Sequence, residues 1–426
     1  MHWWTNEVDI FNTEIVVIGL GYVGLPTAVA FSNKFKVIGF DNNLQRIEEL
    51  QRGFDRNSIT SSNSSFNANL LFTSSLQKSN LHRVFIITVP TPVDSQKNPD
   101  LSSLMEVSAF VGSLLNKGDL VVYESTTFPG CTEEVCIPLL TAHSDLSLRD
   151  DYGVAYSPER ISPGDKSSII DIPRLIAAID TPWLEYAFLI YKAIYQKNVM
   201  RVSNIKVAEA AKLVENCQRD INISFMNEIA IIMDKLSINN QEVLSAAKTK
   251  WNFLPFEPGL VGGHCISVDP YYLIHKSKEA GYEPEVIGAG RKVNEFMSTF
   301  VASKSVKLML ERGIDIKKST ALILGATYKE NCPDTRNAKA FDIFRELQEY
   351  SISVTLFDPV ADESTIPEDI NFTNDFSNLR HYDLIIIAVP HLIFFDLPIS
   401  NCLKSISVVF DLKNRFTSQL PVDASL

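Results

Sequence analysis

The chain has 426 residues, with 39 Lys and Arg against 51 Asp and Glu and a formal net charge of −12. This length exceeds what one hydrophobic core supports, so we expect two or three domains. The acidic balance argues against nucleic acid or an anionic membrane surface as the main partner. An anionic small ligand stays compatible with it, provided that Lys and Arg gather locally around that ligand.

The six cysteines form no Cys-x-x-Cys pair, so the sequence indicates neither a zinc site nor a disulfide framework, and we expect no metal. The first residues lack the basic region and apolar run of a signal peptide. No stretch reaches the roughly 20 apolar residues of a membrane helix. We therefore expect a cytoplasmic protein with reduced thiols and no membrane partner.

A nucleotide-binding pattern opens the chain. Glu14–Ile18 predicts a buried parallel strand, and it runs into Gly19-Leu20-Gly21-Tyr22-Val23-Gly24, a G-x-G-x-x-G. An Ala- and Val-rich helix follows to about Phe31, and Lys36–Phe40 predicts a second strand. In such a motif the first glycine allows a tight turn, the second lets a pyrophosphate approach backbone N–H groups, and the third packs helix on strand.

The second strand ends in an acid. Asp41 lies 22 residues after Gly19, where a carboxylate receives the ribose hydroxyls of a dinucleotide. Because this carboxylate would repel a 2′-phosphate, the pattern favours NAD over NADP. Arg46 is a second candidate for a cofactor contact, and it would bind a phosphate instead.

Polar residues follow three further predicted strands. These are Val84–Val89 before Pro90-Thr91-Pro92, Leu120–Glu124 before Ser125-Thr126-Thr127, and Val154–Tyr156 before Ser157-Pro158-Glu159-Arg160. Open α/β sheets bind ligands at the carboxyl ends of their strands, so these residues are candidates for ligand contact. Loop capping is the alternative for each Thr. Residues 57–69 are rich in Ser and Asn and predict a polar loop.

Residues 205–235 predict one long helix. An apolar arc recurs at helical spacing and comprises Val207, Ala211, Val214, Ile221, Phe225, Ile229, Ile232 and Leu236. The opposite side carries a polar stripe of Glu209, Lys212, Asn216 and Arg219. A solvated face is the ordinary explanation of such a stripe, although Asn in mid-helix counts mildly against it. A helix of this length also suits a bridge between domains or a dimer contact.

A lone thiol follows a glycine pair in Gly262-Gly263-His264-Cys265, with Asp269 four residues on. Glycines permit close approach of the backbone to a neighbour, and a thiol is both a good nucleophile and a tolerable leaving group. A small buried core residue is the alternative for Cys265. Lys248 and Lys250 precede this segment.

A second α/β pattern begins at Thr320–Leu324, after an amphipathic helix that ends near Gly313. Its segments echo the first pattern, since Ile323-Leu324-Gly325 matches Val17-Ile18-Gly19 and Phe357-Asp358 matches Phe40-Asp41. We predict an α/β protein of two Rossmann-like doubly wound domains, joined by a long central helix and a helical dimerisation region. The expected domains are 1–203, 204–315 and 316–426.

These motifs, in this order, resemble the UDP-glucose/GDP-mannose dehydrogenase family over nearly the whole chain. The segments that carry the resemblance are Ile18–Pro26, Val89–Pro92, Tyr123–Thr126, Ser157–Arg160, Glu209–Arg219, Trp251–Cys265 and Tyr328–Arg336. Within the family, Trp251–Cys265 is most similar to the bacterial UDP-N-acetylhexosamine 6-dehydrogenases of capsule, Vi-type and O-antigen synthesis.

The resemblance implies a four-electron oxidation of a UDP-N-acetylhexosamine to its uronic acid with two NAD, in a homodimer or larger assembly. The catalytic residues that it implies are Cys265 as nucleophile, Lys212, Asn216, Asp269, Glu159 and Thr126. It assigns NAD contacts to Gly19, Gly21, Tyr22, Val23, Gly24, Asp41, Arg46, Thr91, Thr126 and Arg336. It assigns substrate contacts to Arg160, Ile161, Lys212, Asn216, Arg219, Lys248, Lys250, Gly262, Tyr328 and Lys329.

Three questions stay open, namely the epimer of the sugar, the effect of Ser267 on the sugar pocket, and the choice between rival functions. The sugar epimer is one of them, with UDP-N-acetylmannosamine or UDP-glucose as alternatives. Ser267 stands where relatives carry Gly, so it would narrow the sugar pocket. The rival functions are a two-electron NAD dehydrogenase with a structural Cys265, and a non-catalytic sugar-nucleotide-binding protein.

Overall fold

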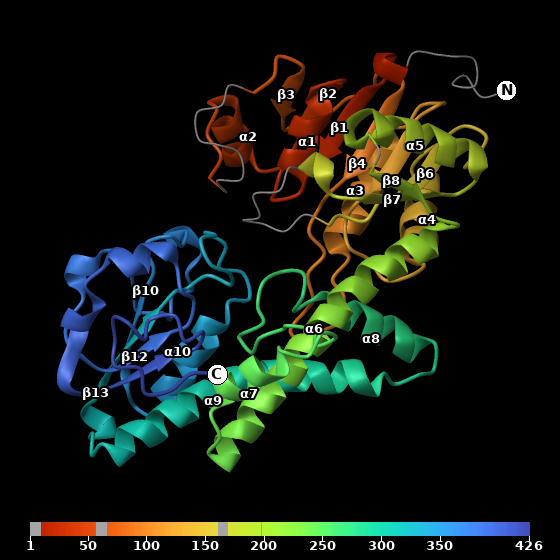
Figure 1. Cartoon of the computed structure of the whole chain (residues 1–426). Helices are drawn as coiled ribbons and strands as arrows, with labels where there is room; N and C mark the ends of the chain where they lie inside the picture. Colours follow the sequence, from red (N-terminus) through yellow and green to blue (C-terminus); the bar gives the residue numbers. More distant parts are fainter. Residues whose placement is uncertain (1–9, 57–65, 161–168, 197) are drawn as a thin grey trace. The chain divides into compact units, whose positions relative to one another are not determined.

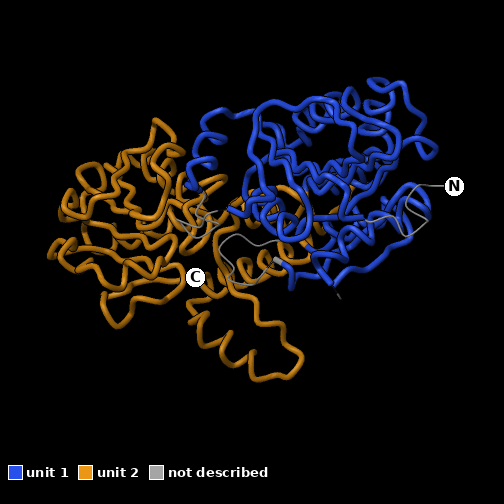
Figure 2. Tube along the Cα trace, turned by 90° about the horizontal axis from the view of Figure 1, so that it is seen from above, with its two compact units in different colours: residues 1–215, 271–282 blue, residues 216–270, 283–426 orange. Residues whose placement is uncertain are grey.

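The computed structural model describes residues 10–56, 66–160, 169–196 and 198–426. The chain divides into two compact units (Figure 2). Unit 1 comprises residues 1–215 and 271–282, and unit 2 comprises residues 216–270 and 283–426. The division falls inside one long helix, α6 (Ile205–Leu236). The expected domain boundaries at 203 and 315 stay predictions.

Unit 1 alternates strands and helices (Figure 1). Its elements are β1 (Glu14–Ile18), α1 (Gly24–Ser32), β2 (Lys36–Phe40), α2 (Leu44–Gln51), β3 (Leu70–Thr73), β4 (Arg83–Ile87), α3 (Ser102–Leu114), β5 (Leu120–Tyr123), α4 (Ile137–Ala142), β6 (Gly153–Tyr156), β7 (Arg174–Ala178), α5 (Thr181–Tyr195) and β8 (Val199–Arg201). The strand order is β3-β2-β1-β4-β5-β6-β7-β8, and β6 and β7 form the antiparallel pair. The central strands are runs of Ile, Val and Phe because helices cover parallel sheets on both faces.

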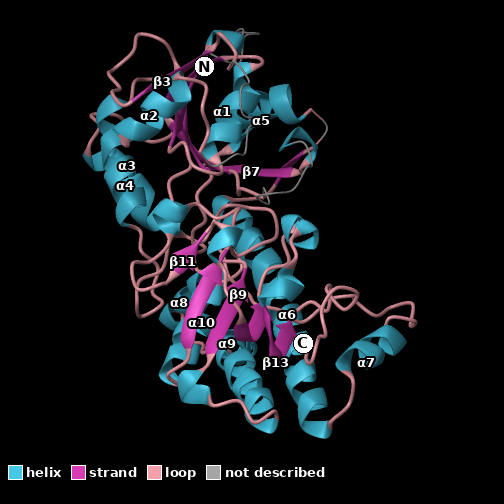
Figure 3. Cartoon of the chain, turned by 90° about the vertical axis from the view of Figure 1, so that its left-hand side faces the viewer, coloured by secondary structure: helices cyan, strands magenta, loops and turns pink. Residues whose placement is uncertain are grey.

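The elements that follow α6 belong to unit 2, except that α8 belongs to it only at Asp269 and Pro270 and to unit 1 from Tyr271 on. They are α7 (Asn240–Ala247), α8 (Asp269–Glu279), α9 (Glu285–Glu311), β9 (Thr320–Leu324), α10 (Lys339–Glu349), β10 (Ser353–Phe357), β11 (Phe372–Thr373), β12 (Tyr382–Ile387) and β13 (Leu403–Asp411). The strands form a parallel sheet in the order β11-β10-β9-β12-β13. Figure 3 shows β9 and β13 with α9 and α10 beside them.

The two sheets repeat one design. The order β3-β2-β1-β4-β5 in unit 1 matches β11-β10-β9-β12-β13 in unit 2. The registers also correspond, since Ile18 pairs with Phe40 in unit 1 and Leu324 pairs with Phe357 in unit 2. A left-handed glycine follows each first strand, Gly19 at φ +91° and Gly325 at φ +95°. The structure therefore confirms two Rossmann-like doubly wound sheets.

The long, strongly patterned elements agree with the sequence prediction within a few residues, and β1, β2 and β9 agree at both ends. The short strands β3, β7 and β8 were not predicted. The predicted polar loop at 57–69 falls partly outside the described residues, and β3 starts directly after it at Leu70.

Along α6, several apolar side chains are exposed and several polar ones are buried, which is the reverse of an ordinary amphipathic helix. Members of its apolar arc lie on the surface of the chain, with Val214 56% exposed and Phe225 52% exposed. On the opposite side, Glu209 and Lys212 are buried. The polar stripe is therefore not a solvated face near its start, and side chains of unit 1 surround these two residues. No helix in the described part of the chain is both long and apolar enough to cross a membrane.

The glycine motif supplies a prediction about stability. A Cβ at Gly24 would lie 1.8 Å from the carbonyl oxygen of Gly19 and 2.5 Å from Thr88 Oγ1. A Cβ at Gly21 would meet nothing within 4 Å. We expect Gly24→Ala to destabilise the protein by at least about 1–3 kcal/mol, as overpacking does. Gly21→Ala is the matched control and should keep the wild-type melting curve in calorimetry. Equal melting temperatures for the two variants would contradict this packing role of Gly24.

Candidate active site

The first βα turn of unit 1 fits a dinucleotide. Gly19 adopts a left-handed conformation, and the space beside Gly21 is open. Thr88 at the end of β4 holds the turn, since its hydroxyl lies 2.9 Å from the Ile18 carbonyl oxygen and 2.8 Å from that of Gly19. Backbone N–H groups at the start of α1 are therefore presented to an anion, as pyrophosphate binding requires.

Asp41 follows the second strand, and its carboxylate accepts two hydrogen bonds. Its Oδ2 accepts from the backbone N of Leu20 at 2.8 Å, and its Oδ1 accepts from that of Asn43 at 2.9 Å. A carboxylate accepts about four hydrogen bonds, so two positions suit a ribose diol. Arg46 is buried instead, with Nη2 2.8 Å from Asp55 Oδ1 and Nε donating to the Leu20 carbonyl. These contacts favour Asp41 over Arg46 as the residue that reads the ribose.

The corresponding acid of unit 2 is saturated. Asp358 Oδ2 accepts from Ala326 N at 2.7 Å and from His391 Nε2 at 2.9 Å. Its Oδ1 accepts from the backbone N–H groups of Val360 and Ala361. His391 Nδ1 accepts the N–H of Asn331 at 2.8 Å, so Nε2 carries the proton and donates to Asp358.

Residues at the carboxyl ends of the strands of unit 1 are joined by hydrogen bonds. Thr91 Oγ1 donates to the Thr126 carbonyl at 2.8 Å, which joins two of the candidate cofactor residues. Ser125 Oγ donates to the Val89 carbonyl at 2.7 Å. Tyr272, which the sequence analysis missed, donates its hydroxyl proton toward the Thr91 carbonyl at 3.0 Å. The loops after β4 and β5 therefore form one hydrogen-bonded layer at the carboxyl edge of the sheet.

Lys212 and Glu159 meet in unit 1. The Lys212 Nζ lies 4.0 Å from Glu159 Oε2, and both side chains are buried. Arg174, also buried, reaches toward the Pro158 carbonyl at 3.5 Å and so supports the segment that carries Glu159. Arg160 forms an ion pair with Glu215. Ile161 lies outside the described residues.

Glu209 is a functional candidate that the sequence analysis left in the polar stripe. Its buried carboxylate accepts from Gly130 N at 2.6 Å, from the N–H and hydroxyl of Thr132 at 3.0 and 2.7 Å, and from Thr127 Oγ1 at 3.2 Å. Burial raises the pKa of Glu209, and the four donors oppose that rise. The segment after Thr126 thus begins a π-helical turn, Thr132–Cys136, against α6.

The thiol of Cys265 stands in a constrained loop of unit 2. A Cβ at Gly262 would lie 2.5 Å from the Asn337 carbonyl oxygen, and one at Gly263 would lie 2.8 Å from the Tyr328 ring. Gly263 also has φ +83°. Cys265 itself is half-buried, and its Sγ lies 3.2 Å from His264 Nδ1. Its carbonyl accepts from the N–H groups of Val268 and Asp269 at 3.0 and 2.8 Å. The alternative of a fully buried core cysteine does not hold.

Two more candidate residues meet in unit 2, where Asn216 Nδ2 donates to Asp269 Oδ2. Ser267 lies in the same loop as Cys265. Its hydroxyl is buried and donates to the Gly263 carbonyl in its own loop. It therefore tightens the loop, and its predicted effect on the width of a sugar pocket stays a prediction.

A cavity of about 450 Å³ opens in unit 2 beside the strand ends of the second sheet. Three candidate substrate residues line it, Gly262, Tyr328 and Lys329. Lys339 and Lys413, which the sequence analysis missed, line it as well. Lys413 Nζ donates to the Pro258 carbonyl at 3.0 Å, and burial lowers its pKa. Lysines gathered in a cavity with apolar walls suit an anionic nucleotide.

The remaining candidates lie apart from this cavity. Arg336 forms an ion pair with Asp334 at 2.6 Å, and Lys248 forms one with Glu257 at 2.9 Å. Arg219 and Lys250 are exposed. Within the described ranges, no group of three or more His, Cys, Asp or Glu is placed to hold a metal ion.

Comparison with known proteins identifies the group to which the chain belongs. Models of the UDP-glucose/GDP-mannose dehydrogenase family match it in succession, the NAD binding domain at residues 13–196, the central domain at 206–296 and the UDP binding domain at 322–418. The chain is 46% identical over 411 residues to protein CapL of Staphylococcus aureus, covering 96% of this chain and 97% of CapL. The chain belongs to the UDP-glucose/GDP-mannose dehydrogenase family.

Two other members of the family are informative. A UDP-N-acetyl-D-glucosamine 6-dehydrogenase of Salmonella typhi is 46% identical over 411 residues, covering 95% of this chain and 96% of that enzyme. The solved structure of a UDP-D-ManNAc dehydrogenase from Pyrococcus horikoshii matches with a TM-score of 0.81 at 28% identity, covering 97% of this chain and 98% of that one. The chain is thus an NAD-dependent dehydrogenase of this family, and NAD is its cofactor.

The free positions on Asp41 lead to a prediction about the cofactor. We expect kcat/KM to be far lower with NADP than with NAD, because a 2′-phosphate would approach a carboxylate. Asp41→Asn should narrow the difference by weakening the use of NAD and removing the repulsion. Steady-state kinetics with both cofactors measure this. Comparable kcat/KM values for NAD and NADP in the wild type would show that Asp41 does not select the cofactor.

Proposed function

We propose that this protein oxidises the 6-hydroxymethyl group of a UDP-N-acetylhexosamine, of the gluco or galacto type, to the carboxylate. The observation that carries the proposal is the 46% identity over nearly the full length to an enzyme named UDP-N-acetyl-D-glucosamine 6-dehydrogenase. The match to a UDP-D-ManNAc dehydrogenase is 28% identical, which makes the manno epimer the second candidate. A thiol, a buried Lys–Glu pair and an Asn–Asp pair supply the groups that the reaction needs.

The first oxidation converts the alcohol to an aldehyde. In the proposal, Lys212 takes the hydroxyl proton, and Asn216, one helical turn further along α6, donates to the developing oxyanion. NAD, which the first βα turn and Asp41 would hold, would supply the hydride acceptor for each of the two oxidations. Burial of Lys212 beside Glu159 fits this role, because charge stabilisation is strongest where water is excluded.

The second oxidation proceeds on the enzyme. The thiolate of Cys265 adds to the aldehyde carbon, and the resulting oxyanion of the thiohemiacetal is stabilised by Lys212 and Asn216. Loss of hydride from that carbon leaves a thioester, and water then cleaves its C–S bond, releasing the carboxylate and the thiol. We assign water activation and proton transfer to Glu159 and Asp269, with Thr126 holding the water or the nicotinamide. In total, one alcohol, one water and two NAD⁺ would yield one carboxylate, two NADH and three protons.

Binding of the nucleotide belongs to the cavity of unit 2 in this proposal. Gly262, Tyr328 and Lys329 line it, and Lys329 offers a charge to the diphosphate. Arg160, Ile161, Arg219, Lys248 and Lys250 stay candidate substrate contacts, and Arg336 stays a candidate NAD contact. The six cysteines are free, which suits the reducing cytoplasm that we propose as its location. We propose surface polysaccharide synthesis as the fate of the uronic acid.

The rival two-electron dehydrogenase is distinguished by stoichiometry. We expect two NADH per sugar consumed, counted by absorbance and by mass spectrometry of the product, across a panel of UDP-GlcNAc, UDP-GalNAc, UDP-ManNAc and UDP-glucose. Cys265→Ser should lose overall turnover, because an alcohol is a poor nucleophile and its ester is hydrolysed slowly. Cys402→Ser, a buried cysteine within the second sheet unit, is the matched control. One NADH per sugar, or normal turnover of Cys265→Ser, would sink the four-electron proposal.

We also propose that the protein forms a homodimer through α6. Val207, Val214, Phe225, Ile232 and Leu236 are all between 42% and 59% exposed. Their spacing of 7, 11, 7 and 4 residues places them in one stripe on the helix. A continuous apolar stripe on a long helix is typical of a helix–helix interface.

This stripe leads to a prediction about assembly. Phe225→Glu should shift the protein toward monomer in light scattering at micromolar concentration, because it places a charge in the centre of an apolar interface. Leu44→Glu is the control, since Leu44 is 65% exposed on α2 and away from the stripe. A monomeric wild type, or a dimer unchanged by Phe225→Glu, would exclude this interface.

A further inference from the structure

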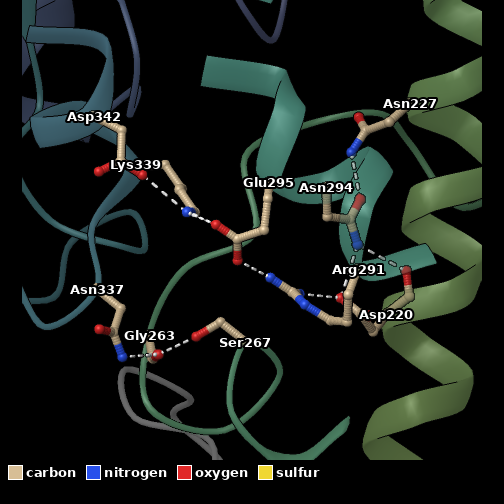
Figure 4. A network of polar contacts seen from close by, with 10 residues as sticks. All are labelled: Asp220, Asn227, Gly263, Ser267, Arg291, Asn294, Glu295, Asn337, Lys339 and Asp342. Atoms are coloured by element: carbon tan, nitrogen blue, oxygen red, sulfur yellow. Dashed lines mark hydrogen bonds and ion pairs between the residues drawn. The ribbon is translucent and has the colours of Figure 1, made fainter. Parts of the chain in front are cut away.

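The Gly263 carbonyl, in the loop that carries Cys265, accepts hydrogen bonds from two side chains. Asn337 Nδ2 donates to it at 3.0 Å, and Ser267 Oγ donates to it from the other side of the loop. Figure 4 shows both donors converging on this oxygen. Ser267 belongs to the loop itself, whereas Asn337 lies 74 residues away in the sequence. Asn337 is thus an external anchor for the peptide plane between Gly263 and His264.

The backbone of Asn337 adds a second constraint. Its carbonyl oxygen occupies the space that a Cβ at Gly262 would need, at 2.5 Å. On the other side, Tyr328 packs against Gly263. The glycine pair is therefore enclosed by two residues of the segment 328–337, which reaches the nucleotide cavity through Tyr328 and Lys329. Asn337 itself adopts a left-handed conformation, φ +51°, in which Asn is enriched among the residues other than Gly.

We propose that Asn337 is a positioning residue for the nucleophile, acting through the Gly263 carbonyl to set where the Cys265 thiol points. The proposal rests on the assignment of Cys265 as nucleophile. A rotation of the Gly263 peptide plane moves His264, whose Nδ1 lies 3.2 Å from Cys265 Sγ. It thereby changes both the direction of the thiol and its nearest polar neighbour. The amide of Asn337 opposes that rotation from outside the loop, whereas Ser267 belongs to the loop and moves with it.

The test uses two substitutions that keep the left-handed backbone. Asn337→Gly removes the side chain, and Asn337→Asp keeps its size and exchanges the donor for an acceptor that repels the Gly263 oxygen. We expect kcat to fall by about 10- to 100-fold, because small displacements of a reacting group cost this much. The Kd for UDP, measured by calorimetry, should stay within about twofold of wild type. The second readout is the rate at which iodoacetamide alkylates Cys265, measured as a function of pH by peptide mass spectrometry. In both variants this pH dependence should differ from that of the wild type.

Ser351→Gly is the matched control, since Ser351 has φ +64° at an exposed site just after α10. It should leave kcat and the alkylation profile unchanged. Wild-type kcat and a wild-type alkylation profile in both Asn337 variants would overturn the proposal. If Asn337→Gly does not fold, Asn337→Asp alone decides. Failure of the proposed function is distinguished separately. Turnover of Cys265→Ser tests whether Cys265 is the nucleophile, whereas alkylation of Cys265 in the Asn337 variants tests how the thiol is placed.

Discussion

A buried ion pair between two long helices underlies the candidate site in unit 2. Asp220 on α6 and Arg291 on α9 are both buried and 2.6 Å apart, and Asn294 donates to the same carboxylate (Figure 4). Removing one partner of such a pair costs about 3–5 kcal/mol, since the other charge is left buried alone. Arg291 also pairs with Glu295, which in turn holds Lys339 at the cavity. One charge network thus runs from α6, one turn beyond Asn216, to the wall of the nucleotide cavity.

The same helices fix the start of the Cys265 loop. Asn227 on α6 forms a two-way amide pair with Gly259, accepting from its N–H at 2.8 Å and donating to its carbonyl at 3.0 Å. The loop is then held at Gly259 by Asn227 of α6, at Gly263 by Asn337, and at Cys265 by the N–H groups of Val268 and Asp269, where α8 begins. A thiol on so restrained a backbone is preorganised, which spares the reaction the cost of ordering it. Glu209 performs the corresponding task in unit 1, where it gathers the segment that follows Thr126.

Local pattern and tertiary contact explain what could be predicted from the sequence. Runs of Val and Ile bounded by Gly or Asp located β1, β2 and β9, because local sequence decides a fully buried parallel strand. The apolar arc of α6 located the helix but not its buried face, since periodicity does not say what covers a stripe. Lys212, Glu159, Asn216 and Asp269 were recognised by family resemblance, and the structure pairs them. Asn337 and Arg174 act through partners far away in sequence, and no short motif indicates them.

The saturated carboxylate of Asp358 has a consequence for how the enzyme handles two nucleotides at once. Four donors of its own unit fill it, whereas the described contacts of Asp41 fill half of its capacity. The two sheets share a strand order and a left-handed glycine after their first strand, so Asp358 stands at the position that corresponds to Asp41. His391 Nε2 and the backbone N–H groups of Ala326, Val360 and Ala361 therefore leave Asp358 with no further position to accept from a ribose diol.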